Sequence, residues 1–588
     1  MPIKRYVNTP GLVLATLGAL MCYQTAARAE DTAEEIRALR AQLKKLEAKV
    51  NAQARMQKES HVQIRTVESR PAPTPVQIPS GIALGPLVGA PQTGLTATQS
   101  DIRGLPVAGS PSLYINGVSI TPGGFFELAG VFRDRFIGAD IATPWQAIPF
   151  YNSRTGLANE FRMSARQSRA NLLVKGDVNP STHLAAFIEL DFLGAAQTAN
   201  SNESNSYTPR IRHLYATLDQ DDLGAHVLAG QTWSLITMNS KGIVPRQENI
   251  PLQIDAGYVP GFVWTRTPEI RFVKDFDKTF WAGVSVESPA TTFGCAPTGS
   301  PLAIGCTPAG PYVAGLPTTG PAALLPGSLV YNVAPPGGSL FNSANTYSLN
   351  HLPDVAGKLA WDSSLEGHNI HLEGFGLFRD FYSQVNNSNQ DVAGWGAGGS
   401  MLVSLLPKQL ELQFSGMTGR GIGRYGSAQL SDVAFNWNGA ISPLQQTMLF
   451  AGLTFHPTPD LDMYVYAGQE AQQASTSTIT LGTGKTIAVS AYGYGNPLYT
   501  NAGCSIIGSA VCNGNIHLIR QLTGGIWDNL YSGPFGKVRV GLQYSFTQKY
   551  SFPGFGGSAK TEDSIGLFSI RYYPFDAPPP PAPVIAKY

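Results

Sequence analysis

Charge is scarce in this chain. Charged residues make up 14% of its 588 residues, whereas soluble domains typically carry roughly 25%. The formal net charge is only +1, so there is no global field that would attract nucleic acid or an acidic partner, and no nucleic-acid partner is expected. Together with 63 glycines and 10% aromatic residues, the lack of charge favours a β-rich protein with many turns.

Long hydrophobic runs are also missing, with one short exception near the N-terminus. Residues 11–21 form an apolar run after Lys4 and Arg5, and the small residues of ARA at 27–29 offer a cleavage site. This pattern predicts a secretory signal peptide over residues 1–29. A membrane-spanning helix is the weaker interpretation, because the run is about half of the roughly 20 residues that a span requires. A membrane location would therefore require a barrel.

Cysteine is rare, with five residues in the chain. Four follow the predicted signal peptide and form two close pairs in Gly/Pro/Ser-rich segments, Cys295 with Cys306 and Cys504 with Cys512. In an exported protein, both pairs are predicted to be disulfides that staple loops. Neither pair has the ligand spacing of a zinc site, and the nine histidines show no such spacing either. We therefore expect no metal and no cofactor.

The sequence contains no nucleotide-binding or catalytic motif that meets its structural requirements. The stretch LGTGKT (481–486) lacks the first glycine of a P-loop, since Ile479 stands in its place. Gly421, Gly423 and Gly426 spell GxGxxG, but they follow a strand pattern and do not open a helix. No GxSxG nucleophile motif is present. No catalytic residue is predicted, and an enzyme is not the expectation.

A short helix is predicted after the cleavage point, over residues 30–59. Its apolar residues recur at alternating steps of three and four, which is a heptad seam; they are Ile36, Leu39, Leu43, Leu46 and Val50. Two to three heptads are too few for a stable isolated coiled coil. We interpret the segment as a periplasmic aid to oligomerisation, most simply of a trimer. The alternative is an amphipathic helix that packs on its own domain.

Alternating strands dominate the rest of the chain, after a Pro/Gly-rich linker at residues 60–111. Runs of about ten residues alternate in polarity, as in SRANLLVKGDV and GKVRVGLQYSF. Short connections such as 179–182 and 406–409 alternate with long ones such as 137–159 and 472–515. This asymmetry is typical of outer-membrane β-barrels.

The predicted fold class is therefore all-β, a transmembrane antiparallel barrel of about sixteen strands preceded by the coiled-coil helix. The domain boundaries are a signal peptide at 1–29, the coiled coil at 30–59, the linker at 60–111, the barrel at 112–575 and a Pro-rich tail at 576–588. The predicted location is the outer membrane of a Gram-negative-type cell.

The succession SRANLLVKGDV (168–178), HLAAFIELDFLG (183–194), IRHLYATL (211–218) and LAGQTWSLI (228–236) resembles the DcaP-like trimeric outer-membrane porins. The resemblance implies a homotrimer in outer-membrane lipid, with an N-terminal coiled coil before a sixteen-stranded barrel. It implies a passive channel for small hydrophilic solutes that prefers anions such as dicarboxylates. It also implies that residues 234–261 fold inward as the constriction loop.

Alternation also assigns the pore-lining cations. Phe126, Leu128 and Phe132 are predicted to face lipid, which turns the residues between them inward. Arginine in a water-filled lumen costs little, whereas at the lipid midplane it costs roughly 2 to 4 kcal/mol. The predicted pore-lining residues on regularly alternating strands are Arg133, Arg135, Arg169, Lys175 and Arg539. Further candidates are Arg210, Arg212 and Arg266, whose strands alternate poorly, and Lys241 and Arg246 in the constriction loop. Glu248 and Asp255 are the predicted acidic counterweights.

These charges have two interpretations. They either select anions or merely keep the lumen hydrated and ordered through ion pairs. Two alternatives to a channel also stand, namely a structural protein that tethers the membrane to the cell wall through its coiled coil, and a secreted soluble β-sandwich array or adhesin.

Overall fold

The computed structural model describes residue 44 and the ranges 112–194, 208–294, 332–333, 347–385, 388–436, 440–476, 479–480, 486–487 and 493–576. The chain divides into two compact units, Met1–Pro91 and Gln92–Tyr588, and all described residues except residue 44 belong to the second. The predicted signal peptide and linker lie outside the described residues. The coiled coil, with the exception of residue 44, also lies outside them. The same holds for Cys295, Cys306 and nearly all of the Pro-rich tail.

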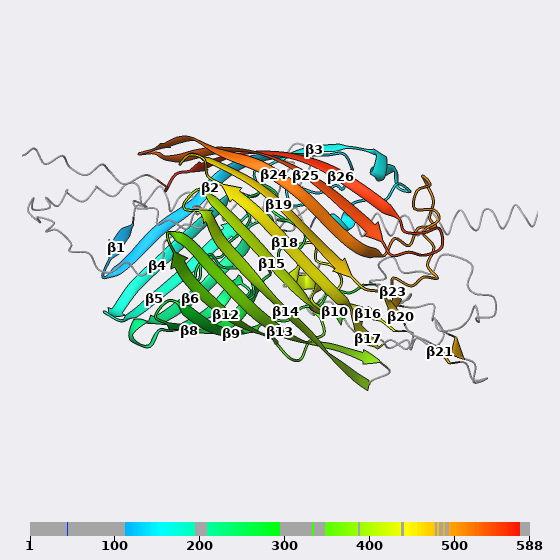
Figure 1. Cartoon of the computed structure of the whole chain (residues 1–588), viewed down its shortest axis with the longest axis horizontal. Coiled ribbons are helices and arrows are strands. Elements are labelled where there is room, and N and C mark those ends of the chain that lie inside the picture. The colour runs from blue at the N-terminus through cyan, green and yellow to red at the C-terminus, as the bar shows by residue number, and fades with distance from the viewer. Residues whose placement is uncertain are drawn as a thin grey trace, which may run out of the picture. The chain divides into compact units, whose positions relative to one another are not determined.

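Sixteen antiparallel strand positions close into a barrel. Figure 1 shows the strands of the barrel with their labels. The second position is shared by β3 and β4, because the C-terminal part of β2 pairs with β3 and its N-terminal part pairs with β4. The last strand, β26, pairs with β2 and closes the ring. The predicted antiparallel barrel and its strand number are confirmed.

The barrel strands are β2 (Val118–Arg133), β3 (Glu160–Ser164), β4 (Arg169–Asn179), β5 (Thr182–Asp191), β6 (Arg210–Gln220), β7 (Ala225–Trp233), β8 (Arg266–Phe276), β9 (Phe280–Glu287), β12 (Asp354–Leu365), β13 (His368–Val385), β14 (Ser388–Leu406), β15 (Leu410–Arg420), β18 (Gln445–Phe455), β19 (Leu461–Gln472), β24 (Ile516–Gly533), β25 (Gly536–Ser551) and β26 (Lys560–Tyr573). The additional elements are β1 (Leu113–Ile115), β10 (Asn332–Val333), β11 (Tyr347–Ser348), β16 (Val433–Phe435), β17 (Ile441–Pro443), β20 (Ser475–Thr476), β21 (Ile479–Thr480), β22 (Thr486–Ile487), β23 (Gly493–Tyr494) and the 3₁₀ turns η1 (Trp145–Ala147), η2 (Arg154–Leu157), η3 (Asp221–Leu223) and η5 (Gly423–Tyr425).

The strands present apolar side chains to the outside of the barrel. On β2, Phe126 is 66% exposed while its neighbour Glu127 is 3% exposed. On β25, Leu542 and Tyr544 are exposed while Gln543 between them is buried. Apolar side chains on the outside of a closed barrel are stable only when they contact lipid and not water. This architecture places the chain in an outer membrane and contradicts the soluble sandwich.

The connections differ in length at the two ends of the barrel. Long segments join β2 to β3, β7 to β8, β9 to β12, β15 to β18 and β19 to β24, whereas the turns at the other end are short, such as 180–181 between β4 and β5 and 534–535 between β24 and β25. We call these the long-loop end and the short-turn end. The predicted asymmetry is confirmed.

One predicted disulfide lies within the described residues. Cys504 and Cys512 are bonded, with their Cα atoms 4.7 Å apart, in the segment between β19 and β24. The bond staples this loop at the long-loop end, as predicted.

Among the described residues, no helix has the length and apolarity needed to cross a membrane.

Candidate functional site

The segment between β7 and β8, residues 234–265, folds into the barrel, and we call it the inward loop. Ile236, Ile254, Val259 and Phe262 of this loop have essentially no exposed surface. A loop on the outside of a barrel would leave such side chains in water, so their burial requires that the loop pack on the inner wall. The inward fold implied by the resemblance is present.

The inward loop packs on two stretches of the wall. Its later half, with Leu252 and Tyr258, joins an apolar cluster with inward residues of β2, β18, β19, β24 and β26. Its ends, with Leu235 and Val263, join a second cluster with inward residues of β8, β9, β12, β13 and β15. Strands β4 to β6 contribute to neither cluster. The space that stays open therefore lies between the loop and the wall that includes β4 and β6.

Side chains of the barrel wall also form hydrogen bonds with backbone groups of the inward loop. The indole of Trp527 donates to the carbonyl of Leu252 at 2.6 Å, and the Leu252 amide donates to the Tyr466 hydroxyl at 3.1 Å. The amide of Gly261 donates to Glu470 at 2.8 Å. On the opposite wall, the Lys358 ammonium donates to the carbonyl of Thr237 at 2.8 Å. Because buried backbone groups must find partners, these bonds fix the loop in one position.

Asp255 joins the inward loop to the segment after β2. Its carboxylate accepts from the Thr143 amide at 3.0 Å, from the Thr143 hydroxyl at 2.5 Å and from the Gly257 amide at 2.8 Å. Burial raises the pKa of Asp255. This predicted counterweight thus lies in a buried junction between two loops.

A cavity of about 100 Å³ lies between the inward loop and the wall. The loop contributes residues 246–253 and Tyr258, while β4, β6 and β26 each contribute an arginine. The lining arginines are Arg169, Arg212, Arg246 and Arg571. We call them the lumen arginines.

Three of the lumen arginines have carboxylate partners on the wall behind them. Arg212 pairs with Glu189 at 2.6 Å and with Asp191 at 3.1 Å. Arg169 lies 3.8 Å from Glu189, and Arg571 pairs with Glu127 at 3.0 Å. The carboxylates hold the guanidinium groups in place, and none of these three acids lines the cavity.

Arg246 differs from the other three. Its guanidinium lies 5.5 Å from the centre of the Phe187 ring and donates to the Tyr215 hydroxyl at 3.4 Å. Among the described residues, no carboxylate lies within ion-pair distance of it. Its positive charge therefore acts on the cavity without a direct counter-ion.

Glu248 is the carboxylate that lines the cavity. Both of its oxygens are buried and have no hydrogen-bond partner among the described residues. Burial raises the pKa of Glu248, although the charges of Arg271 and Arg246 oppose that effect. An acid whose pKa is raised offers less negative charge, and the lining of the cavity holds four arginines against this one carboxylate.

Tyr258 of the inward loop lies in the same positive electrostatic field. Burial alone would raise the pKa of its hydroxyl, but the positive charges of Arg212 and Arg169 outweigh burial and lower it. A tyrosine pKa is lowered in a buried place only where positive charge gathers.

The other predicted pore-lining cations do not themselves line the cavity. Arg133 is buried against Glu160 at 3.0 Å, Arg210 pairs with Asp191 at 2.6 Å, and Arg539 pairs with Asp462 at 2.5 Å. The guanidinium of Arg266 packs against the rings of Trp233 and Trp264, at 5.2 and 5.5 Å from their centres. Arg133 and Arg539 face inward from their strands, as alternation predicted.

Three further predicted residues complete the set. Arg135 follows the end of β2 and stacks on Tyr151, with its guanidinium 5.1 Å from the ring centre. Lys175 lies half-buried on β4, at an inward position. Lys241 is exposed at a turn of the inward loop. The structure therefore gathers Arg169, Arg212 and Arg246 of the predicted set at the cavity.

Arg571 is the lumen arginine that the sequence analysis missed. It lies on β26 between Ile570 and Tyr572, which are both exposed on the outer face. Alternation along the strand was the signal that would have identified it. Its guanidinium also stacks 4.5 Å from the centre of the Trp527 ring.

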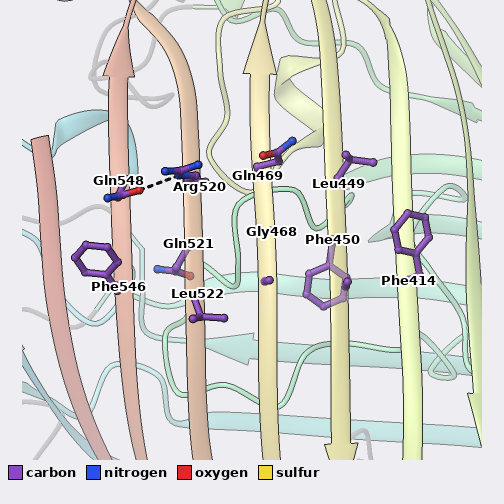
Figure 2. A pocket seen from close by; sticks show the side chains of 12 residues that line it. Phe414, Leu449, Phe450, Gly468, Gln469, Arg520, Gln521, Leu522, Phe546 and Gln548 are labelled. Atoms are coloured by element: carbon purple, nitrogen blue, oxygen red, sulfur yellow. Dashed lines mark hydrogen bonds between the residues drawn. The ribbon is translucent and has the colours of Figure 1, made fainter. Parts of the chain in front are cut away.

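A second cavity, of about 320 Å³, lies on the outer face and not in the lumen (Figure 2). Phe414, Leu449 and Leu522 line it and are exposed. At one end Arg520 donates to Gln548 at 2.8 Å, as the dashed line in Figure 2 marks. Because these three exposed side chains face outward, this hollow belongs to the lipid-facing surface.

Comparison with known proteins supports the fold. No family model and no curated protein matches the chain. The outer-membrane channel DcaP of Acinetobacter baumannii matches structurally with a TM-score of 0.51 and 17% identity, over 78% of this chain and 98% of that one. The fold expected from the resemblance is thus confirmed.

Two other similar structures are more distant. An anion-selective porin from Comamonas acidovorans has a TM-score of 0.40 and 10% identity, over 78% of this chain and 99% of that one. Salmonella typhi OmpF in complex with daunomycin has a TM-score of 0.38 and 10% identity, over 79% and 100%. Both are too distant to add to the argument.

Proposed function

We propose that the protein is a passive outer-membrane porin through which small hydrophilic solutes diffuse, with a preference for anions. The observation that carries the proposal is the set of four lumen arginines around a cavity whose one lining carboxylate, Glu248, has a raised pKa. Positive charge in a narrow, low-dielectric passage raises the local concentration of anions and repels cations.

The lumen arginines also suggest the class of anion. Arg169, Arg212 and Arg571 project from the wall, whereas Arg246 comes from the inward loop and its guanidinium reaches Tyr215 of β6. A small dicarboxylate can place one carboxylate on Arg246 and the other on an arginine of the wall, which a monocarboxylate of the same length cannot do. Dicarboxylate-like solutes are therefore the proposed substrates.

The oligomer is part of the same proposal. We infer a homotrimer joined in part by the coiled coil at residues 30–59, a segment that lies outside the described residues. Chemical cross-linking of the purified protein in mild detergent tests this, and a ladder that ends at three subunits is the expected result. The tether alternative depends on the same segment, and no described residue favours it.

Swelling of liposomes that contain the protein tests the channel and its preference together. The solutes are a four-carbon dicarboxylate, the diol of the same length and the diamine of the same length. The proposal expects swelling rates in the order dicarboxylate, diol, diamine. Equal rates for all three would refute the preference but keep the channel, and no swelling with any solute would refute the channel.

A further inference from the structure

A histidine and two aspartates converge on the outer face of the barrel at its long-loop end. His351 lies just before β12, Asp380 near the end of β13 and Asp391 near the start of β14. The Nδ1 atom of His351 lies 3.3 Å from Oδ1 of Asp391 and 3.7 Å from Oδ2 of Asp380. The ligand atoms of the three residues all lie within 4.8 Å of one another.

This arrangement differs from the other histidine–carboxylate groups of the described chain. His213 and His456 each contact a single carboxylate, whereas His183, His226 and His371 each contact one carboxylate through Nδ1 and a second through Nε2. Those two ring atoms point in opposite directions, so no single ion can contact both carboxylates and the ring. At His351 both carboxylates approach the same nitrogen, and within the described residues neither contact has hydrogen-bond geometry.

Asp380 supplies an independent indication of a ligand. Its side chain is only 8% exposed, and Oδ2, the atom nearest His351, has no hydrogen-bond partner among the described residues. A buried carboxylate without partners is costly unless a cation compensates its charge. The ring of Tyr382 packs edge-on against His351, 4.7 Å between centres, and orients its Nδ1 atom.

The distances suit a tetrahedral ion. Zinc bonds to nitrogen and oxygen of roughly 2.0 to 2.2 Å place two tetrahedral ligand atoms about 3.3 to 3.6 Å apart. The two separations from His351, 3.3 and 3.7 Å, come close to that spacing, and the ligand oxygens of the two aspartates lie within 4.8 Å of each other. One imidazole with two carboxylates suits zinc and similar ions, whereas calcium and magnesium prefer oxygen ligands alone.

We propose that His351, Asp380 and Asp391 bind a zinc-class divalent cation, with water in the fourth position. The aromatic side chains of Phe378 and Trp395 pair across β13 and β14 and are both exposed on the outer face. Such side chains mark the membrane interface. Both aspartates lie beyond this pair toward the long-loop end, so an ion reaches them from outside the cell. It would tie the segment before β12 to the β13–β14 hairpin.

Sequence reasoning expected no metal site. The three proposed ligands are far apart in the chain, and only the pairing of β13 with β14 brings the aspartates together. No sequence motif with a fixed spacing of ligands identifies such a site.

The test is calorimetric titration of Zn²⁺ into the full-length folded protein in detergent, without a polyhistidine tag and after treatment with a chelator. The variants are His351→Gln and Asp380→Asn. His183→Gln is the matched control, because it also removes a histidine between two aspartates. We expect one ion per chain in the wild type and in the control, and affinity reduced by at least about tenfold in both site variants.

Cobalt absorption gives a second readout. Co²⁺ in a tetrahedral site of this kind should give an intense visible band in the wild type that His351→Gln abolishes. If Asp380→Asn does not fold, His351→Gln decides, since the side chain of His351 is 44% exposed. Equal zinc affinity in the wild type and His351→Gln would overturn the proposal. Displacement of zinc by millimolar magnesium would overturn the proposed ion class.

Discussion

The indole nitrogen of Trp527 donates a hydrogen bond of 2.6 Å to the carbonyl of Leu252, 275 residues away in the sequence. This bond joins β24 to the inward loop and helps to fix the position of the loop in the lumen. The same indole stacks under Arg571 and Arg539, 4.5 and 5.2 Å from their guanidinium carbons. Trp527 therefore supports both the loop and the charged wall beside it.

Replacement of Trp527 by phenylalanine should loosen the inward loop. The substitution keeps most of the apolar volume but leaves the buried Leu252 carbonyl without its donor, which costs about 1 to 3 kcal/mol. Urea unfolding in detergent should show that loss, and single-channel recordings should show a noisier open current. Trp395→Phe, which alters a lipid-facing side chain, should change neither property. A Trp527→Phe protein with the current noise and the urea stability of the wild type would contradict the proposed role.

Arg246→Glu should reverse or nearly abolish the preference for anions. Arg246 has no carboxylate partner among the described residues, so its charge is not offset locally. Lys241→Glu makes the same charge change in the same loop, but Lys241 lies outside the cavity lining. The anion-to-cation permeability ratio should fall much further in the first variant than in the second. Equal effects would mean that only the net charge of the loop matters.

Arg571→Gln should lower anion permeability by about threefold, which corresponds to about 0.6 kcal/mol, while Arg571→Lys should retain most of it. The lysine keeps the positive charge but loses the planar guanidinium, whose Nε donates to Glu127 at 3.0 Å and which stacks on Trp527. Arg520→Gln removes an arginine from the outer face and serves as the control. Swelling rates with a dicarboxylate measure all three variants, and a loss in Arg520→Gln equal to that in Arg571→Gln would argue against the lumen assignment.

The anion preference should grow as the pH falls. Burial raises the pKa of Glu248, so this carboxyl takes up its proton at a higher pH than an ordinary glutamate and then removes a negative charge from the cavity. Glu248→Gln should show the larger preference already at neutral pH and a flatter pH profile. Permeability ratios between pH 4 and pH 8 measure the difference. Identical profiles in the two proteins would exclude Glu248 as the titrating group.

The same raised pKa has a consequence for stability. The folded protein holds the Glu248 proton to a higher pH than the unfolded chain does. The stabilisation from that proton is therefore present below the unfolded pKa and is lost as the pH rises through the folded pKa. Glu248→Gln should consequently be more stable than the wild type at neutral pH, as judged by the urea midpoint. A less stable Glu248→Gln protein would contradict this.

Alternation of side chains was sufficient to predict which face meets lipid on strands with a regular pattern, such as β2 and β25. Phe126 and Glu127 occupy the predicted faces, and so do Leu542 and Gln543. Strand number and the asymmetry of the connections followed from the same pattern. The sequence did not reveal the break between β3 and β4, because that break depends on how both segments pair with β2.

The candidate site was only partly predictable, for a geometric reason. Alternation of polarity predicts which face of its strand a residue occupies, but not its position along the barrel axis. That position decides which inward-facing arginines lie next to the inward loop. Arg169 and Arg539 both face inward, yet only Arg169 lines the cavity, whereas Arg539 is paired with Asp462 elsewhere on the wall. The folded position of residues 234–265 depends on hydrogen bonds to distant strands, and local sequence carries no signal for these.

The most direct test of the central claim is the zero-current potential of the wild-type protein in a planar bilayer with a tenfold potassium chloride gradient. The account predicts stepwise channel openings and a reversal potential displaced toward the equilibrium potential of chloride. A bilayer without channels, or a reversal potential displaced toward that of potassium, would contradict it.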